Sequence, residues 1–298
     1  MALPRFGTVL TAMVTPFSSD GSVNFDVAGQ IAKFLVEQGC DGLVIAGSTG
    51  EGSALSDEEK MDLFSCVAQA VNVPVLAGTT SSNTAESVEL TSRVAATGVA
   101  GVLATTPAYA RPSQSGIAAH FSAIANSTKL PVMLYDIPIR TGRKIKSETT
   151  VNLVRSLVNV IAMKDASGDL VQAAHTKAVL GDELDLYSGD DSVVLPFMAI
   201  GAVGLVSVAA HWAAPEFSAL VRCVEKGDWE KAREFNERLA PSCEWEGGEF
   251  YPNPIPAKSA LRALGFAVGQ CRLPLGPGDA TCDAEAAEIV ASLQATRG

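Results

Sequence analysis

The 298-residue sequence has few basic residues: 22 Lys and Arg stand against 33 Asp and Glu, which gives a formal net charge of −11. Nucleic acids and anionic membranes both attract basic patches on their protein partners. The longest cluster of Lys and Arg runs only from Arg140 to Lys146. The sequence therefore argues against a nucleic acid or a membrane as a partner.

Charged residues of either sign are also scarce, at 18% of the chain, whereas hydrophobic residues make up 47%. This composition excludes a disordered chain and predicts a compact globule that buries a large core. Because so little of the sequence is charged, we also expect further copies of the chain to cover part of its surface.

Cysteine and histidine lack the spacing of a metal or redox site. The six cysteines form no CxxC pair, and the three histidines are far apart, with no HExxH motif (Cys40, Cys66, Cys223, Cys243, Cys271 and Cys282; His120, His175 and His211). Metal-binding motifs place such ligands at short, fixed spacings. We therefore expect no metal, ordinary reduced thiols and a cytoplasmic protein.

One long stretch, Val193 to Pro215, has no Asp, Glu, Lys or Arg and is long enough to cross a bilayer, which takes about 20 residues. Glycines interrupt it, and Leu205 to Val208 alternates as a strand does. We interpret it as a helix, a turn, a strand and the start of a helix inside a buried barrel. Met1 to Val14 likewise predicts a first strand and not a signal peptide, because no small-residue cleavage site follows.

Strand-like and helix-like segments alternate along the first three quarters of the chain. Strands are predicted at 8–15, 43–46, 74–77, 99–105, 131–135, 160–164, 184–187 and 205–208, and helices at 25–38, 57–71, 84–97, 115–127, 147–158 and 170–180. This repeat predicts a (β/α)8 barrel, of the TIM type, over residues 1–227. Residues 228–298 predict a small carboxyl-terminal helical domain, with helices at 229–239, 258–264 and 284–293. A doubly wound sheet is the alternative, but the sequence lacks the GxGxxG and GxxxxGK[ST] nucleotide-binding motifs.

The stretch Val160 to Gly168 places a lone lysine, Lys164, at the carboxyl end of an apolar run. Active sites of parallel barrels collect at this end of the strands. An ammonium removed from water is disfavoured relative to the amine, so a buried lysine there can attack carbonyl groups at neutral pH. The alternative is a lysine that reaches solvent and pairs with Asp165. The loops after the other strands favour the nucleophile.

Three of those loops carry residues suited to chemistry. Gly47 to Gly52 has glycines that allow close backbone approach and consecutive N–H groups that can hold a carboxylate. Thr105 to Pro112 and Tyr135 to Gly142 supply hydroxyls, two tyrosines and Arg140. If the barrel brings these loops to one mouth, they form a proton relay around a Schiff base, with Arg140 available to pair with a second carboxylate. Taken separately, each loop is also explained by ordinary turns and core packing.

Six motifs extend this set over nearly the whole chain. They are GSTGE (47–51), TTPAYARPSQ (105–114), YDIPIRTG (135–142), MKDASGD (163–169), YSGDD (187–191) and NPIPAK (253–258). In type and order they resemble the pyruvate-dependent class I aldolase superfamily, to which N-acetylneuraminate lyase belongs. The resemblance implies a lyase without a cofactor, in which the lysine forms an imine with the substrate pyruvate.

The resemblance also implies the roles of individual residues. The catalytic residues would be Lys164, which forms the Schiff base, Tyr135 and Ser48, which move protons, and Tyr109, which reaches the site of a neighbouring subunit in a homotetramer built from dimers.

Substrate binding would fall to four further residues. Thr49 would hold the carboxylate of pyruvate, Gly189 and Val206 would line the pocket, and Arg140 would bind the carboxylate of the second substrate.

The most similar members of the family condense pyruvate with L-aspartate 4-semialdehyde in lysine and diaminopimelate biosynthesis. Ser48 departs from their usual threonine, keeping the hydroxyl but losing the methyl group that restricts its rotamer. A second hypothesis is a lyase that cleaves a sialic or sugar acid, although those enzymes have no arginine at the position of Arg140. A third is a non-catalytic keto-acid sensor, which would have no need of Lys164.

Inhibited members of the family bind lysine at a subunit interface. Glu86 is retained from that site, whereas Asp57 and Lys60 stand where histidines are usual, Ser82 replaces an asparagine and Ala108 replaces an aromatic residue. Loss of the aromatic wall and a cation near the ligand's ammonium both disfavour binding. We therefore expect no strong inhibition by lysine.

Overall fold

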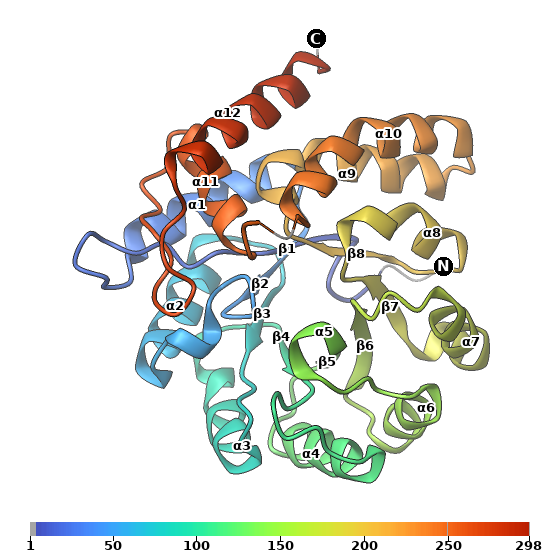
Figure 1. Cartoon of the computed structure of the whole chain (residues 1–298). Coiled ribbons are helices and arrows are strands. Elements are labelled where there is room, and N and C mark those ends of the chain that lie inside the picture. The colour runs from blue at the N-terminus through green and yellow to red at the C-terminus, as the bar shows by residue number, and fades with distance from the viewer. Residues whose placement is uncertain (1–3, 249, 298) are drawn as a thin grey trace.

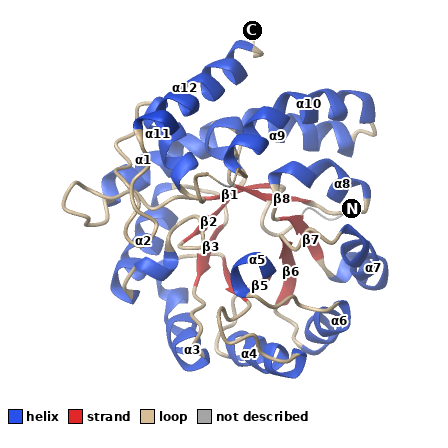
Figure 2. Cartoon of the chain, viewed as in Figure 1, coloured by secondary structure: helices blue, strands red, loops and turns tan. Residues whose placement is uncertain are grey.

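The computed structural model describes residues 4–248 and 250–297. A closed barrel of eight parallel strands in chain order lies at its centre, with helices around the outside (Figures 1 and 2). The strands are β1 (Val9–Ala12), β2 (Gly42–Ile45), β3 (Val75–Gly78), β4 (Gly101–Thr105), β5 (Val132–Asp136), β6 (Val160–Asp165), β7 (Asp185–Ser188) and β8 (Gly204–Ser207). The predicted (β/α)8 barrel is therefore confirmed.

Side chains on each strand alternate between the barrel interior and the layer under the helices, as the period of two requires. On β2, Val44 belongs to the interior cluster, whereas Leu43 and Ile45 pack in the outer core. On β6, Ala162 lies inside and Met163 outside. The same alternation turns Lys164 toward the interior, at the carboxyl end of its strand.

Helices follow the strands in sequence, and most of them cover the outside of the barrel (Figure 2). They are α1 (Phe25–Glu37), α2 (Asp57–Ala70), α3 (Thr84–Arg93), α4 (Gln114–Asn126), α5 (Pro138–Thr141), α6 (Ser147–Ser156), α7 (Leu170–Leu180), α8 (Val194–Ala199) and α9 (Ala210–Glu225). The start of α2 has the predicted capping box, in which the Ser56 hydroxyl accepts from the Glu59 N–H at 3.1 Å and the Glu59 carboxylate accepts from the Ser56 N–H at 2.9 Å. The short α5, after β5, was not predicted.

The uncharged stretch folds as α8, β8 and the start of α9, as predicted. Among the described residues, no helix is long and apolar enough to cross a membrane.

Three further helices, α10 (Trp229–Glu246), α11 (Ile255–Ala263) and α12 (Ala280–Ala295), follow the barrel. The helices α10 and α11 pack against α9, and α12 packs against α10 and α11. The predicted end of the first of these at Leu239 is wrong, because α10 continues through Pro241. Beyond the proline, Ser242 is buried and accepts a hydrogen bond from the indole N–H of Trp212 at 3.1 Å. Tertiary packing here outweighs the helix-breaking cost of proline, about 3 kcal/mol.

Candidate active site

Lys164 and Tyr135 are neighbours at the carboxyl end of the barrel. They pair in register between β6 and β5, and both side chains are buried, with exposed fractions of 4% and 3%. The Lys164 ammonium nitrogen lies 4.4 Å from the centroid of the Tyr135 ring. A lysine in this place is removed from bulk water and stands beside a hydroxyl-bearing ring, as a proton relay to an imine requires.

Gly189, which directly follows β7, leaves the space that the Lys164 side chain fills. A Cβ at this position would lie 2.9 Å from both Cγ and Cε of Lys164. Val206, on β8, is buried in the interior cluster that also contains Tyr135. Gly189 therefore lies against the Lys164 side chain, and Val206 lies in the same interior layer as Tyr135, while their role in lining a pyruvate pocket stays a prediction.

The loop after β2 is tightly folded and presents backbone N–H groups. A Cβ at Gly52 would lie 2.1 Å from the carbonyl oxygen of Ala46, so only glycine fits there. Among the described residues, no group accepts a hydrogen bond from the N–H of Ser48 or Thr49. Consecutive free N–H groups of this kind suit a carboxylate.

Asn253, from the segment before α11, joins this loop to Arg140. Its side-chain amide donates to the Thr49 hydroxyl at 3.0 Å, and its carbonyl oxygen accepts from Nη2 of Arg140 at 3.2 Å. Arg140 lies on α5, at the end of β5. The structure thus holds Thr49 and Arg140 through one residue far away in the sequence.

A cavity of about 650 Å³ opens beside these loops. Ser48, Thr106, Ala108 and Arg140 are among the residues that line it. Ser48 and the predicted carboxylate-binding Arg140 therefore line one space, large enough for two small substrates.

Of the four predicted catalytic residues, Ser48 lines this cavity, whereas Lys164, Tyr135 and Tyr109 do not. Tyr109 differs from the other two in being exposed. Its side chain is 97% exposed, and its backbone φ of 68° lies in the left-handed region, which costs energy for a non-glycine residue. Within one chain, Tyr109 points away from Lys164 into solvent.

Two of the sequence motifs, GSTGE and NPIPAK, are joined by a buried ion pair that the sequence analysis did not predict. Glu51 of GSTGE and Lys258 of NPIPAK face each other at 2.6 Å, and each side chain is 1% exposed. The ammonium of Lys258 also lies 4.2 Å from the ring centroid of Phe17. Glu51 further accepts a hydrogen bond from the backbone N–H of Arg272 at 2.8 Å. Because Glu51 closely follows Ser48 and Thr49 in the chain, these contacts also restrain the Ser48–Thr49 loop.

Glu246, the last residue of α10, is an acidic group that our sequence analysis missed. Burial and the negative charges of Asp191 and Asp190 raise the pKa of Glu246 well above its usual value. The positive charges of Lys164 and Arg140 act on it in the opposite direction. Glu246 lies outside every motif of the sequence analysis, so nothing in the sequence pointed to it.

No group of three or more His, Cys, Asp or Glu side chains suited to a metal ion occurs in residues 4–248 and 250–297. Burial lowers the pKa of His120 and of His211 to about 4, so both are uncharged at neutral pH. Each belongs to the core: Nδ1 of His120 bonds to the Thr84 hydroxyl at 2.9 Å, and Nε2 of His211 accepts from the Val14 N–H at 3.1 Å.

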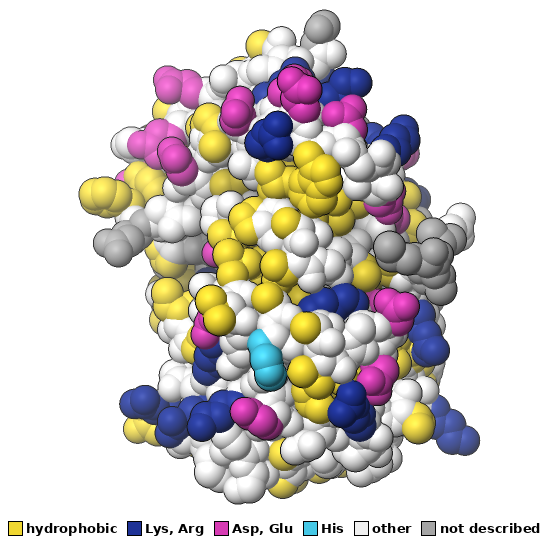
Figure 3. All heavy atoms as spheres, turned by 90° about the vertical axis from the view of Figure 1, so that its right-hand side faces the viewer, with side chains coloured by type: hydrophobic (Ala, Val, Ile, Leu, Met, Phe, Trp, Pro, Cys, Tyr) yellow, Lys and Arg dark blue, Asp and Glu magenta, His cyan; other side chains and the backbone are white. Residues whose placement is uncertain are grey.

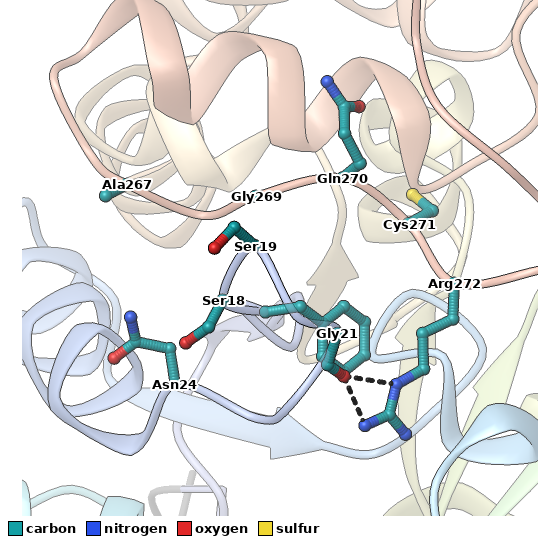
Figure 4. Close-up of a pocket in the computed structure, with 10 residues that line it drawn as sticks. Ser18, Ser19, Gly21, Asn24, Ala267, Gly269, Gln270, Cys271 and Arg272 are labelled. Carbon is teal, nitrogen blue, oxygen red and sulfur yellow. Dashed lines mark hydrogen bonds between the residues drawn. The ribbon is translucent and has the colours of Figure 1, made fainter.

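A second hollow lies between the loop after β1 and the segment after α11, away from Lys164. Figure 4 shows the Arg272 side chain in it, directed at Gly21. The guanidinium donates to the Gly21 carbonyl oxygen from Nε at 3.0 Å and from Nη2 at 2.7 Å, and it also pairs with Glu59. Because these partners occupy its donors, Arg272 fastens the two segments together and offers no free charge to a ligand.

Comparison with known proteins shows the family of the whole chain. The model of the dihydrodipicolinate synthetase family matches residues 5–293. The chain is 46% identical over 274 residues to the 4-hydroxy-tetrahydrodipicolinate synthase 2 of Halalkalibacterium halodurans, covering 91% of this chain and 93% of the relative. It is 44% identical over 278 residues to the 4-hydroxy-tetrahydrodipicolinate synthase of Synechococcus elongatus, covering 92% of both.

A solved structure of the Cyanidioschyzon merolae enzyme, described as having lysine bound, superposes with a TM-score of 0.94 at 40% identity, covering 97% of this chain and 99% of that one. Site geometry, family model and relatives agree over nearly the full length, and the chain therefore belongs to the dihydrodipicolinate synthetase family.

Proposed function

We propose that the chain condenses pyruvate with L-aspartate 4-semialdehyde to 4-hydroxy-tetrahydrodipicolinate, through an imine between pyruvate and Lys164. The observation that carries this proposal is the buried Lys164 beside Tyr135 at the carboxyl ends of β6 and β5. The names of the Synechococcus and Halalkalibacterium relatives support the same reaction.

In the first half of the reaction, the amine of Lys164 attacks C2 of pyruvate, and the carbonyl oxygen leaves as water. The N–H groups of Ser48 and Thr49 hold the pyruvate carboxylate. Loss of a proton from the methyl group then gives the enamine. Tyr135 and the Ser48 hydroxyl carry these protons, together with Tyr109 of a neighbouring subunit.

In the second half, the enamine carbon attacks the aldehyde carbon of the semialdehyde and forms the carbon–carbon bond. Arg140 pairs with the carboxylate of this substrate, and its planar fork fixes the direction of approach. The substrate's own amine then attacks the imine carbon, which closes the ring and releases Lys164 as a free amine. The chemistry requires no cofactor or metal, because every proton and leaving group comes from the substrates and these side chains.

We further propose a homotetramer built from dimers. The exposed Tyr109 supports this assembly, because it can act in catalysis only across an interface. Apolar side chains also gather on the face where α7 and α8 lie, shown in Figure 3, and Val171 of α7 is 83% exposed. The six free cysteines suit a reducing compartment, such as the cytoplasm.

Trapping the imine tests the proposed chemistry. After incubation with pyruvate and reduction with borohydride, peptide mapping should find the added mass on Lys164. Lys258, which is equally buried, is an internal control and should carry none. Absence of an adduct, or an adduct that persists in Lys164→Ala, would refute the mechanism.

Turnover of the second substrate tests the reaction itself. The enzyme should consume L-aspartate 4-semialdehyde only in the presence of pyruvate. An imine that forms normally while only a sialic or sugar acid is cleaved would assign the chain to a lyase of the same superfamily instead.

A further inference from the structure

Asp136, the last residue of β5, lies directly after Tyr135 and is fully buried, but neither half of the reaction uses it. Its Oδ1 accepts a hydrogen bond from the backbone N–H of Ile145 at 3.2 Å. This contact closes a loop of residues 137–144, which we call the Arg140 loop. The loop has an internal bond as well, since the Thr141 hydroxyl donates to the carbonyl oxygen of Ile137 at 3.1 Å.

The other carboxyl oxygen, Oδ2, is buried and has no hydrogen-bond partner among the described residues. A second buried carboxyl group stands next to it, because Asp165 pairs with Asp136 in register across β5 and β6. Lys144, a cation whose charge acts on Asp136, donates instead to Asp169, the N-cap residue of α7. An ionised Asp136 would therefore carry a buried charge without a matching partner, which is costly.

We propose that Asp136 is a positioning residue for the second substrate: its uncharged carboxyl group closes the Arg140 loop and so keeps Arg140 directed at the mouth of the barrel. The proposal rests on the role of Arg140 given above. In this arrangement Oδ1 is the carbonyl oxygen that accepts from Ile145, and Oδ2 carries the proton.

Electrostatics agree with the geometry. Burial raises the pKa of Asp136 to about 7, with a further increase from Asp165, while the Ile145 N–H and Lys144 oppose the change. Burial also raises the pKa of Asp165, although the Ser167 hydroxyl and N–H lower it. As the pH rises through about 7, Asp136 ionises, and the cost of its buried charge falls if the Arg140 loop loosens and admits water. The KM for the semialdehyde should therefore rise above neutrality in the wild type but not in Asp136→Asn, whereas the yield of the pyruvate imine should follow the same pH profile in both.

Two substitutions at this position separate the roles. Asp136→Asn keeps an oxygen that accepts from Ile145 but cannot ionise, so its KM should remain low and lack the rise near pH 7. Asp136→Ala loses the acceptor, and its KM for the semialdehyde should be about tenfold higher even at pH 6.5, which corresponds to one lost hydrogen bond of about 1.4 kcal/mol. Asp185→Asn is the matched control, because burial also raises the pKa of Asp185 but it lies at the opposite end of the barrel, at the start of β7.

The experiment measures kcat and KM for the semialdehyde from pH 6 to 9, together with the yield of the borohydride-trapped pyruvate adduct. The proposal is supported if the wild type and Asp185→Asn share a several-fold rise in KM that Asp136→Asn lacks. It is overturned if the Asp136→Asn and wild-type profiles coincide, and this comparison decides the matter even if Asp136→Ala does not fold. Failure of the proposed function would look different, because the wild type would then form no adduct on Lys164.

Discussion

At the scale of single residues, Gly189 makes the position of Lys164 possible. Gly189→Ala would place a Cβ 2.9 Å from two carbons of the Lys164 side chain and from Cβ of Ala166. We expect the rate of adduct formation with pyruvate to fall by about 100-fold, because a displacement of about 1 Å at a nucleophile has effects of this size. Borohydride trapping over time measures the rate.

Gly29→Ala is the matched control for this substitution. Gly29 lies in α1, and the nearest atom to an added Cβ would be 3.9 Å away. Alanine there should leave adduct formation unchanged and raise the free energy of unfolding by about 0.5–1 kcal/mol. Normal trapping in Gly189→Ala would show that Lys164 does not need this space.

Asp136 also predicts how stability depends on pH. Its pKa is about 7 when folded and near 3.8 when unfolded, so ionisation favours the unfolded chain as the pH rises from about 4 to 7. Asp136→Asn cannot ionise, so its free energy of unfolding does not fall for this reason as the pH rises. The variant should therefore match the wild type at low pH and exceed its free energy of unfolding by on the order of 4 kcal/mol at pH 8. Urea denaturation at several pH values measures the difference, and a constant gap would contradict the prediction.

The predictable part of the site consists of residues that follow strands directly. Lys164, Tyr135 and Gly189 could be placed because strand ends of a barrel meet at one mouth. Asn253 and Glu246 could not, because their positions depend on how segments beyond the barrel fold back onto it, and no repeat in the sequence encodes that path. The proposed role of Asp136 could not be predicted from the sequence either, because it depends on a buried carboxyl oxygen without a hydrogen-bond partner and not on a motif.

At the scale of elements, Arg297, which follows the carboxyl-terminal helix α12, forms an ion pair with α9. Arg297 pairs with Glu216 at 2.6 Å and also donates to the carbonyl oxygen of Trp212 at 2.8 Å. Glu216 is buried, so Arg297→Ala would strand its charge. We expect the free energy of unfolding of Arg297→Ala to fall by about 2 kcal/mol. This is less than for a fully buried pair, because Arg297 is partly exposed.

Arg155→Ala is the control for this prediction. Arg155 pairs with Glu183 at 3.2 Å, and both side chains are about half exposed. Exposed pairs of this kind contribute less than about 1 kcal/mol. Thermal unfolding of both variants should show a clear decrease only for Arg297→Ala, and equal decreases would mean that the burial of Glu216 has little effect.

The surface of α2 and α3 bears on regulation by lysine, which remains a prediction. Lys60 lies beside Asp57 at 3.0 Å, and the Glu86 carboxylate accepts from the Ser81 hydroxyl at 2.9 Å and from the Asn83 amide at 3.2 Å. Lys60, Asp57 and Glu86 all line the cavity. A ligand ammonium would meet a like charge there and a carboxylate that already has partners.

We therefore expect the L-lysine concentration at half-inhibition to be about 1 mM or higher. A dissociation constant of about 1 mM corresponds to a binding free energy of about −4 kcal/mol. Initial rates at saturating pyruvate measure the concentration at half-inhibition. Lys60→Met should increase the sensitivity if repulsion is the cause, and strong inhibition of the unmodified enzyme would contradict our reading of this surface.

The sequence predicted the existence of elements better than their ends. The helix α7 begins and ends at the predicted residues, because its last turn runs directly into Gly181. The end of α10 was predicted too early because Pro241 is a local signal for the end of a helix. The buried contact of Ser242 with Trp212, which favours continuation of the helix, is a tertiary contact that the local sequence does not show. Similarly, α5 is a single turn that starts at Pro138 and is too short to show a helical period.

At the scale of the whole molecule, the exposed Tyr109 predicts that activity depends on assembly. Tyr109→Phe should lower kcat about 10- to 100-fold with little effect on the KM for pyruvate, as expected for a group that moves protons. Analytical ultracentrifugation should find the unmodified enzyme as a tetramer at assay concentration. A fully active monomer, or an equal loss in kcat and in affinity for pyruvate, would contradict this role.

The division into a barrel over 1–227 and a helical domain over 228–298 remains a prediction. Limited proteolysis near residue 227 would test it, and a stable fragment that ends there would support it. The packing of α10 against α9 suggests that such a fragment would expose apolar surface.

The buried pair between Glu51 and Lys258 has a consequence for the order of events during synthesis. The loop that contains Ser48 and Thr49 leaves the ribosome early, but its shape depends on Lys258 through the ion pair with Glu51. Asn253, whose amide donates to the Thr49 hydroxyl, comes 204 positions after Thr49. All eight strands can therefore have emerged while the site is still unfinished. If Lys164 forms the imine proposed above, the nascent chain cannot hold pyruvate in place until Asn253 and Lys258 have been synthesised, when translation is nearly complete.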